Sequence, residues 1–355
     1  MRTDKRILAF LLIIAFVFSL CGCGDSGPKM PSEGSEFAVH FIDVGQADAA
    51  LVICNGKTML IDGGNTDSSN LMYSYLKTHN VKHLDYVVAS HAHGDHVGGL
   101  PGALNYATVG KALCPVTDFD SSAFRNFVKY LTKRGVDITV PETGDTFMLG
   151  EAECTVLAVN TTDNEPNNTS IVLRIVYGET SFLFTGDAER EVELALASSG
   201  FELESTVLKV GHHGSYSSTS YVFLRNVMPK YAVISVGRGN DYGHPTPEVL
   251  SRLRDAEVKV FRTDKHGTVI CTSDGKNLIF GTEKTPKDDV MDGIGSNSVT
   301  TDSGRDYVAN KSSMKFHYPD CASVSKMSEE NRLDFHGKRD ELITQGYDPC
   351  GSCKP

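Results

Sequence analysis

Tryptophan is absent from this 355-residue sequence, and basic residues are too few to balance the acidic ones. Lys and Arg number 34 against 45 Asp and Glu, which gives a formal net charge of −11. This balance excludes a broad basic face of the kind that holds nucleic acid by charge alone. If the protein acts on a nucleic acid, we expect metal ions rather than Lys and Arg to offset much of the phosphate charge.

A serine nucleophile turn is also missing, because no Gly-x-Ser-x-Gly pattern occurs in the sequence. One long apolar run, residues 7–20, follows three basic residues, as the apolar region of a signal peptide follows its charged region. The run therefore predicts export of the chain. The alternative is a short anchor helix that stays uncleaved.

Leu20 and Gly22 precede Cys23 in a pattern that resembles a bacterial lipobox. The resemblance implies that residues 1–23 are a lipoprotein signal peptide and that Cys23 is diacylated. Residues 24–35 are rich in Gly, Pro and Ser, as a tether is. We therefore expect the body of the protein to lie at the extracytoplasmic face of the cell membrane, held there by a lipid anchor.

Residues 36–283 alternate short β-branched runs with amphipathic stretches, which predicts a layered α/β domain. We expect helices at 69–79 and 246–256, the latter with Thr246 as N-cap and Pro247 in its first turn. Expected strands include 37–43, 49–54, 58–62, 84–90, 204–210 and 230–237, with a hairpin over 169–187. Residues 284–306 lack an apolar period and predict a linker.

The stretch Ser90–Gly99 reads SHAHGDHVGG and follows a predicted buried strand. Its charged and ring side chains, His91, His93, Asp95 and His96, are costly to bury together unless a divalent cation accepts the imidazole lone pairs. Glycines follow them and permit a tight turn. The alternative, a polar surface loop, does not explain this density of ligands.

This pattern resembles the metallo-β-lactamase superfamily over about residues 37–281. The superfamily's other signatures occur in order as LIDGG (60–64), TGD (185–187) and GHHGS (211–215). The resemblance implies an αββα sandwich with two divalent metal ions, Zn or Mn, at one edge. Asp187 would bridge the two ions.

A narrower resemblance is to the extracytoplasmic hydrolase domain of ComEC-type competence proteins. It is carried by FIDVGQADAALV, NNTSIVLRI, FLFTGD, LKVGHHGS and YGHPTPEVL. Ala47 stands where that subfamily usually has glycine, and the transmembrane helices of the DNA channel are missing. The resemblance therefore implies the chemistry better than a role in competence.

By this resemblance one metal would be held by His91 and His93, and the second by Asp95 and His96. One histidine of the GHHGS motif, His212 or His213, would complete the set, with a preference for His213 because glycine follows it. Many superfamily members supply a further histidine from the region that here reads NEPNNTS. An amide of Asn167 or Asn168 stands there instead, either as a weak ligand that favours Mn²⁺ or only as part of a turn.

Further polar residues around these motifs are candidates for substrate contact or support. Candidate contacts to phosphate or metal are Lys209, Ser215 and His244. Candidate supports for the ligands are Asp43, Asp48 and Asp62, which otherwise only cap turns. Asp95, His96 and Asp187 are the expected catalytic residues, because paired metals about 3.5–4 Å apart lower the pKa of a shared water to about 7 and clamp a phosphodiester.

The C-terminal residues 307–355 contain two pairs of metal-binding side chains, His317 with Cys321 and Cys350 with Cys353. Two such pairs about thirty residues apart predict one structural zinc ion. The alternative is a Cys350–Cys353 disulfide. The GYDPC motif resembles the metal-binding module of Ada-type DNA-repair proteins, with His317 in place of the first cysteine. The lost cysteine argues against methyl transfer.

Other features of the sequence bear on redox state and charge. Four scattered cysteines in apolar contexts are expected to be buried thiols rather than disulfide partners. They are Cys54, Cys114, Cys154 and Cys271. The zinc module carries modest positive charge on Lys311, Lys315, Lys326 and Arg332, so we expect it to contact DNA.

These observations together predict a metal-dependent hydrolase, a phosphodiesterase or nuclease that acts on DNA. A second hypothesis is a hydrolase of cell-envelope phosphodiesters such as teichoic acid or choline-phosphate groups, which the negative charge favours. A third is a non-enzymatic DNA-binding surface lipoprotein. Nothing in the sequence indicates a protein partner.

Overall fold

The computed structural model describes residues 36–161, 165–291, 305–319, 321–337, 339–353 and 355. The predicted leader, its Cys23 and the tether lie outside the described residues. Among the described residues, none of the helices has both the length and the apolarity that a membrane crossing requires.

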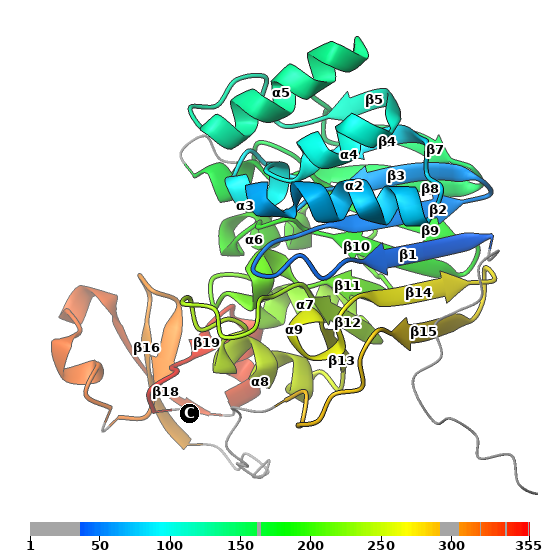
Figure 1. Ribbon diagram of the computed structural model, residues 1–355. Helices are drawn as coiled ribbons and strands as arrows, with labels where there is room; N and C mark the ends of the chain where they lie inside the picture. Colours follow the sequence, from blue (N-terminus) through cyan, green and yellow to red (C-terminus); the bar gives the residue numbers. More distant parts are fainter. Residues whose placement is uncertain (1–35, 162–164, 292–304, 320, 338, 354) are drawn as a thin grey trace, which may run out of the picture.

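Eight strands form the first sheet, in the order β15-β14-β1-β2-β3-β4-β5-β6 (Figure 1). Their bounds are β1 Phe37–Phe41, β2 Ala50–Cys54, β3 Lys57–Ile61, β4 His83–Val88, β5 Thr108–Leu113, β6 Ile138–Thr139, β14 Val269–Ser273 and β15 Leu278–Thr282. Asn55 and Gly56 adopt left-handed φ angles of 48° and 77° and turn β2 into β3. From β3 to β6 the strands run parallel.

Seven strands form the second sheet, in the order β13-β12-β11-β10-β9-β8-β7. Their bounds are β7 Thr146–Leu149, β8 Ala152–Ala158, β9 Val172–Tyr177, β10 Thr180–Phe184, β11 Val207–Lys209, β12 Tyr231–Ile234 and β13 Lys259–Arg262. β9 and β10 form the predicted hairpin. β10, β11, β12 and β13 are parallel, so their carboxyl ends meet at one edge.

Helices cover the outer face of each sheet, and the two sheets face one another (Figure 1). The helices are α2 Ser69–Thr78, α3 Gly94–Val97, α4 Leu100–Tyr106, α5 Ser122–Arg134, α6 Arg190–Ser198, α7 Tyr221–Val227, α8 Pro247–Asp255, α9 Thr263–His266 and α10 Arg339–Thr344. The 3₁₀ turns are η1 Thr66–Ser68, η2 Pro166–Thr169, η3 Gly211–Gly214, η4 Val324–Lys326 and η5 Glu329–Asn331.

Three apolar cores separate the four layers of this domain. Phe37, Phe41 and Phe182 belong to the core between the sheets. A second core lies beneath α2, α4 and α5, and a third beneath α6, α7 and α8. This arrangement confirms the predicted αββα sandwich. The four scattered cysteines are buried and free, as predicted.

A small four-stranded sheet of order β18-β16-β17-β19 forms the C-terminal module. Its strands are β16 Arg305–Asn310, β17 Lys315–His317, β18 Arg332–Gly337 and β19 Asp348–Pro349. The core of this module includes Tyr221 of α7, so the module packs against the second helical layer. Val290 and Met291, in the predicted linker, also pack against that layer, and β16 begins at Arg305, inside the predicted linker.

Candidate metal centre

The candidate ligands lie on loops that follow parallel strands of both sheets. The loop after β4 carries His91 to His96, the loop after β10 carries Asp187, and the turn η3 after β11 carries His212 and His213. Strand β4 of the first sheet and strands β10 and β11 of the second sheet all end at the same edge of the sandwich. Their loops therefore meet there, and residues about 120 positions apart in the sequence become neighbours.

The carboxylate of Asp187 lies at the centre of this cluster and is 2% exposed. Four imidazoles present Nε2 to it. The distances from Nε2 to an Asp187 carboxylate oxygen are 3.3 Å for His96, 3.6 Å for His212, 3.7 Å for His213 and 3.9 Å for His91. Asp95 completes a tighter group with His96, Asp187 and His213, whose ligand atoms all lie within 4.8 Å of one another.

Hydrogen-bond partners behind the rings hold three of these imidazoles in place. His96 Nδ1 is 2.9 Å from Asp62 Oδ2. His213 Nδ1 is 3.1 Å from the carbonyl oxygen of Ser235 and 3.2 Å from Asp48 Oδ1. His212 Nδ1 is 3.3 Å from Glu189 Oε1. A carboxylate at Nδ1 keeps the proton there and leaves the Nε2 lone pair free for a cation.

His91 and His93 form the other half of the cluster. Their Nε2 and Nδ1 atoms are 3.0 Å apart. Burial, followed by the charge of His96, lowers the pKa of His91 well below its ordinary value. A neutral His91 is therefore ready to donate a lone pair. Behind the ring, its Nδ1 is 3.2 Å from the hydroxyl of Ser90.

Unpartnered buried atoms show that this site fits a metal ion. Among the described residues, His96 Nε2 and Asp187 Oδ1 are buried without a hydrogen-bond partner, although they face one another. A buried polar atom left in this way is costly. A divalent cation between them would satisfy both, and imidazole with carboxylate is a donor set that suits Zn²⁺ and Mn²⁺.

The carboxylates set the protonation of the metal-free cluster. Burial opposes protonation of His96, but Asp187, Asp62 and Asp95 outweigh burial, and the pKa of His96 lies well above its ordinary value. Burial likewise opposes protonation of His213, yet Asp187 and Asp48 raise its pKa to about 10. Binding of a cation must therefore release protons from this half of the site.

Left-handed backbone explains why two consecutive histidines reach the same carboxylate. His212 and His213 have φ angles of 48° and 53°, which cost about 1–3 kcal/mol for each such residue. In a helix or strand, neighbouring side chains would diverge. The sequence could not separate the two residues. The structure brings both to Asp187, and only His213 also contacts Asp95, at 3.3 Å.

Glycines are required at this edge mainly by close approach. A Cβ on Gly99 would lie 2.0 Å from the carbonyl oxygen of Gly63, so the loops at 63 and 99 could not meet. Gly186 has a φ of 53°, and a Cβ there would lie 2.9 Å from Ser90 Cβ. We expected the glycines after His96 to permit a tight turn. The structure shows that they are needed because two loops pack closely there.

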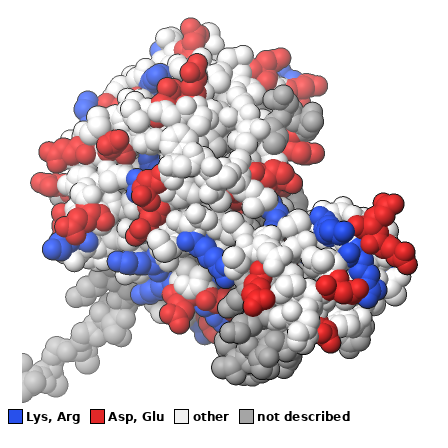
Figure 2. All heavy atoms as spheres, turned by 180° about the vertical axis from the view of Figure 1, so that it is seen from behind, with Lys and Arg blue, Asp and Glu red and all other residues white. Residues whose placement is uncertain are grey.

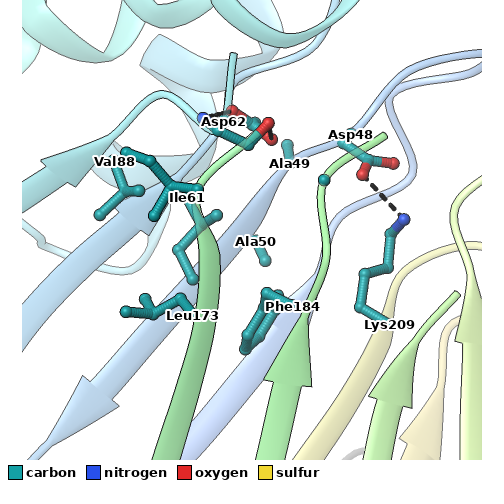
Figure 3. Close-up of a pocket in the computed structure, with 12 residues that line it drawn as sticks. Asp48, Ala49, Ala50, Ile61, Asp62, Val88, Leu173, Phe184 and Lys209 are labelled. Atoms are coloured by element: carbon teal, nitrogen blue, oxygen red, sulfur yellow. Dashed lines mark hydrogen bonds and ion pairs between the residues drawn. The ribbon is translucent and has the colours of Figure 1, made fainter. Parts of the chain in front are cut away.

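Lys209 lies beneath the ligands rather than at the mouth of the site. Its ammonium is buried and is 2.7 Å from Asp48 Oδ2. Figure 3 shows this pair at the rim of a small pocket whose floor is formed by Ile61, Leu173 and Phe184. Burial opposes ionisation of Asp48, but Lys209 and His213 outweigh it and lower the pKa of Asp48 to about 2. The ammonium of Lys209 therefore balances the charge of the Asp48 carboxylate at the boundary of the core.

Asn168 and Ser215, two further predicted contacts, are buried and make hydrogen bonds to residues outside the ligand set. The amide oxygen of Asn168 accepts a hydrogen bond from the Glu189 backbone N–H at 2.9 Å. The hydroxyl of Ser215 is 3.0 Å from that of Ser217. The hydrogen bond of Asn168 matches the alternative in which this residue is only part of a turn.

His244 does border the cluster, with its ring centroid 5.8 Å from that of His212. Its Nδ1 is 3.4 Å from the amide nitrogen of Gln46, and its ring also stacks on exposed Tyr242. Of the three aspartates considered as supports, Asp48 and Asp62 contact ligands. Asp43 instead accepts a hydrogen bond from Gly45 and pairs with Lys284.

Sequence reasoning missed Glu189, Ser90 and Gln46. Glu189 follows the TGD motif closely, and its hydrogen bond from His212 lowers its pKa. Ser90 opens the quoted histidine stretch, and its backbone N–H and hydroxyl both donate to Asp62. An acidic residue two positions after Asp187 was a signal that could have been read. Gln46 carried none.

In the C-terminal module the four predicted zinc ligands come together. The ligand atoms of His317, Cys321, Cys350 and Cys353 all lie within 4.8 Å of one another, and the three cysteines are free. Nδ1 of His317 is buried without a hydrogen-bond partner among the described residues. Three thiols and an imidazole suit tetrahedral zinc, and this arrangement holds no Cys350–Cys353 disulfide.

Comparison with known proteins assigns the chain to a family. The sequence model of the metallo-beta-lactamase superfamily matches residues 42–238, more than half of the chain. The protein therefore belongs to the metallo-β-lactamase superfamily.

Curated relatives include ComE operon protein 3 of Bacillus subtilis, 30% identical over 76% of this chain and 37% of that protein. Competence protein ComA of Neisseria gonorrhoeae is 32% identical over 71% of this chain and 34% of that protein. The chain thus spans about a third of the length of these relatives. The solved metallo hydrolase Igni18 of Ignicoccus hospitalis matches with a TM-score of 0.46 and 17% identity, over 70% of this chain and all of that one.

Proposed function

We propose that this protein is a lipid-anchored, extracytoplasmic phosphodiesterase that cleaves DNA with two divalent metal ions. The observation that carries the proposal is the convergence of four imidazole Nε2 atoms on the Asp187 carboxylate, with Asp95 beside them. Such a donor set holds cations rather than performing acid–base chemistry alone.

The chain's own residues would orient the reacting groups. Divalent cations, when bound, supply a water of pKa about 7 and offset phosphate charge. Asp62 and Asp48 hold the ligand rings His96 and His213 from behind. His244, partly exposed beside His212, would offer a hydrogen bond to a phosphate oxygen.

DNA is the proposed substrate for two reasons. The relatives carry the names competence protein and recombination protein, which concern DNA. The C-terminal module also places Lys315 beside the site's loops, with its ammonium 4.8 Å from the ring centroid of exposed Tyr216. A cation next to an exposed ring suits a phosphate next to a base.

The test uses purified residues 24–355 with single- and double-stranded DNA and added Mn²⁺, Mg²⁺ or Zn²⁺. We expect metal-dependent cleavage that is lost in Asp95→Ala. Asp120→Ala is the matched control, because Asp120 is a fully exposed aspartate that pairs with Arg125. Cleavage retained in Asp95→Ala would contradict the proposal.

A second candidate is hydrolysis of cell-envelope phosphodiesters, favoured by the net charge of −11. On the face shown in Figure 2, Lys and Arg occur in small separate groups among Asp and Glu. Hydrolysis of bis-p-nitrophenyl phosphate without cleavage of any DNA would select this candidate. Metal-independent DNA binding without turnover would instead select a binding lipoprotein.

Lipid anchoring is tested separately. Cys23→Ala should abolish labelling of the protein by radioactive palmitate and release it from the membrane fraction. Unchanged labelling in this variant would contradict the anchor.

A further inference from the structure

A buried ion cluster joins the C-terminal module to the hydrolase domain. The carboxylate of Asp348, on β19, pairs with Nη1 of Arg190 and lies 3.2 Å from Nη2 of Arg252. The side chains of Asp348 and Arg252 are 7% and 3% exposed. Asp348 precedes Cys350, a member of the Cys/His cluster, by two residues, while Arg190 and Arg252 belong to α6 and α8 (Figure 1).

The same two arginines hold the segment that follows the histidine turn. Nη1 of Arg252 donates to the carbonyl oxygens of Ser218 at 2.8 Å and of Tyr216 at 3.2 Å. The backbone N–H of Arg190 donates to the carbonyl oxygen of Ser217 at 3.0 Å. One arginine from each of two helices therefore holds segment 216–219, and the guanidinium groups of both arginines pair with Asp348.

This segment leads directly to a candidate metal ligand. The hydroxyl of Ser217 donates to Glu189 Oε1 at 3.1 Å and lies 3.4 Å from His212 Nδ1. Thr219 shares the left-handed backbone of His212, with a φ of 57°. The stretch 212–219 therefore has left-handed residues at both ends and needs contacts from outside to keep its shape.

The arginines depend strongly on Asp348 for charge compensation. Among the described residues, Nε and Nη2 of Arg190 and Nε of Arg252 are buried without a hydrogen-bond partner. Glu193 interacts electrostatically with Arg252, and its carboxylate accepts hydrogen bonds from the backbone N–H groups of Thr219 and Ser220. Removing the charge of Asp348 would leave two buried guanidinium groups short of a partner, and the helices and the segment they hold would have to shift.

We propose that Asp348 is a positioning residue that couples metal binding at the Cys/His cluster to the geometry of the His212–His213 turn. β19 pairs with β17, which ends at His317, so two ligands of the cluster lie on the strand pair that carries Asp348 or next to it. A metal ion fixes these strands, and Asp348 transmits their position through Arg190 and Arg252. The coupling is independent of the substrate.

The test is a Co²⁺ titration of the metal-free full chain in detergent. Cobalt bound by the Cys/His cluster gives strong thiolate-to-metal absorption, whereas cobalt at the His/Asp centre gives only weak visible bands, so the two sites are followed separately. We expect Asp348→Asn to keep the thiolate bands and to weaken binding at the His/Asp centre about tenfold, in the range found for outer partners of metal ligands.

Asp334→Asn is the matched control, because Asp334 is an exposed aspartate of the same module paired with Arg332. This control should leave both sites unchanged. Cys350→Ser/Cys353→Ser, which disables the cluster and keeps Asp348, should produce the same loss at the His/Asp centre. Unchanged affinity at the His/Asp centre in Asp348→Asn, with the cluster loaded, would overturn the proposal.

A measurement on the unaltered protein covers the case in which a variant fails to fold. Zinc sufficient to fill only the Cys/His cluster, judged by loss of thiol reactivity, should slow hydrogen exchange of the amides in residues 211–219. No slowing there would refute the coupling. Because neither readout is hydrolysis, failure of the coupling and failure of the proposed phosphodiesterase activity are distinguishable.

Discussion

Replacing Asp62 by asparagine tests how the protein prepares a histidine for metal. Oδ1 of Asp62 accepts a hydrogen bond from the Ser90 backbone N–H at 2.7 Å, and Oδ2 lies 2.9 Å from His96 Nδ1. A backbone N–H can only donate, so the amide oxygen of the introduced asparagine must take the Oδ1 position. Its NH₂ group then faces His96 and donates a hydrogen bond.

The consequence for His96 is a change of tautomer. Nδ1 becomes an acceptor, and the proton moves to Nε2, which faces Asp187 Oδ1 at 3.3 Å. The lone pair that a cation needs is then blocked. Loss of such an outer partner weakens metal binding about 10- to 100-fold, which corresponds to about 1.4–2.7 kcal/mol.

The assay is a calorimetric titration of metal-free Asp62→Asn with Mn²⁺, followed by hydrolysis of bis-p-nitrophenyl phosphate. The Ser90 hydroxyl, which donates to Asp62 Oδ2 at 2.7 Å, loses this hydrogen bond to a charged group. The loss lowers the free energy of unfolding by about 1.5–3 kcal/mol, so a domain of ordinary stability stays folded. Asp120→Asn serves as the exposed control. A folded Asp62→Asn protein with unchanged Mn²⁺ affinity would refute the tautomer argument.

Three further predictions concern stability and metal loading. Lys209→Met leaves the buried carboxylate of Asp48 without its partner at 2.7 Å and should lower the free energy of unfolding by about 3–5 kcal/mol; a urea midpoint equal to that of the unaltered protein would contradict this. Ala47 is fully buried without a positive φ, so Ala47→Gly should cost about 1 kcal/mol in the same assay and leave metal affinity unchanged, whereas a gain in affinity would show that alanine impairs the site. Titration of the metal-free protein with metal should show a tight binding step and a weak one. His93→Ala should remove the weak step, and His213→Ala should remove the tight step. Loss of both steps in His93→Ala would show a single coupled site.

The sandwich and the ligand cluster could be predicted because their signals are local. The histidine stretch after β4 and the aspartate after β10 each occupy a few consecutive residues at a strand end. A strand end fixes where a loop starts, so a motif placed there also fixes which edge of the sheet it occupies. The alternation of apolar strands with amphipathic helices predicted a layered α/β domain, and the αββα order came from the superfamily resemblance.

Contacts between distant residues carried no such signal. Lys209, two residues before the GHHGS motif, was a candidate phosphate contact. Only the packing of the two sheets shows that Asp48, from the loop between β1 and β2, neutralises it. Asp348 lay within a recognised motif, but its partners Arg190 and Arg252 are ordinary helix residues. Sequence spacing therefore identifies ligands, whereas counter-charges that hold them require the fold.

The two halves of the metal centre are unequal because different groups lie behind the ligand rings, and not because the ligands themselves differ. His96 and His213 each have a buried carboxylate at Nδ1, and a carboxylate there increases the basicity of the ring toward a cation. His91 has only the hydroxyl of Ser90 behind it. Asn168, the candidate for a weak ligand in this half, turns its oxygen to a backbone N–H. The half formed by His91 and His93 should therefore bind its ion more weakly and exchange it more readily, so the metal supply would determine whether the second ion is present.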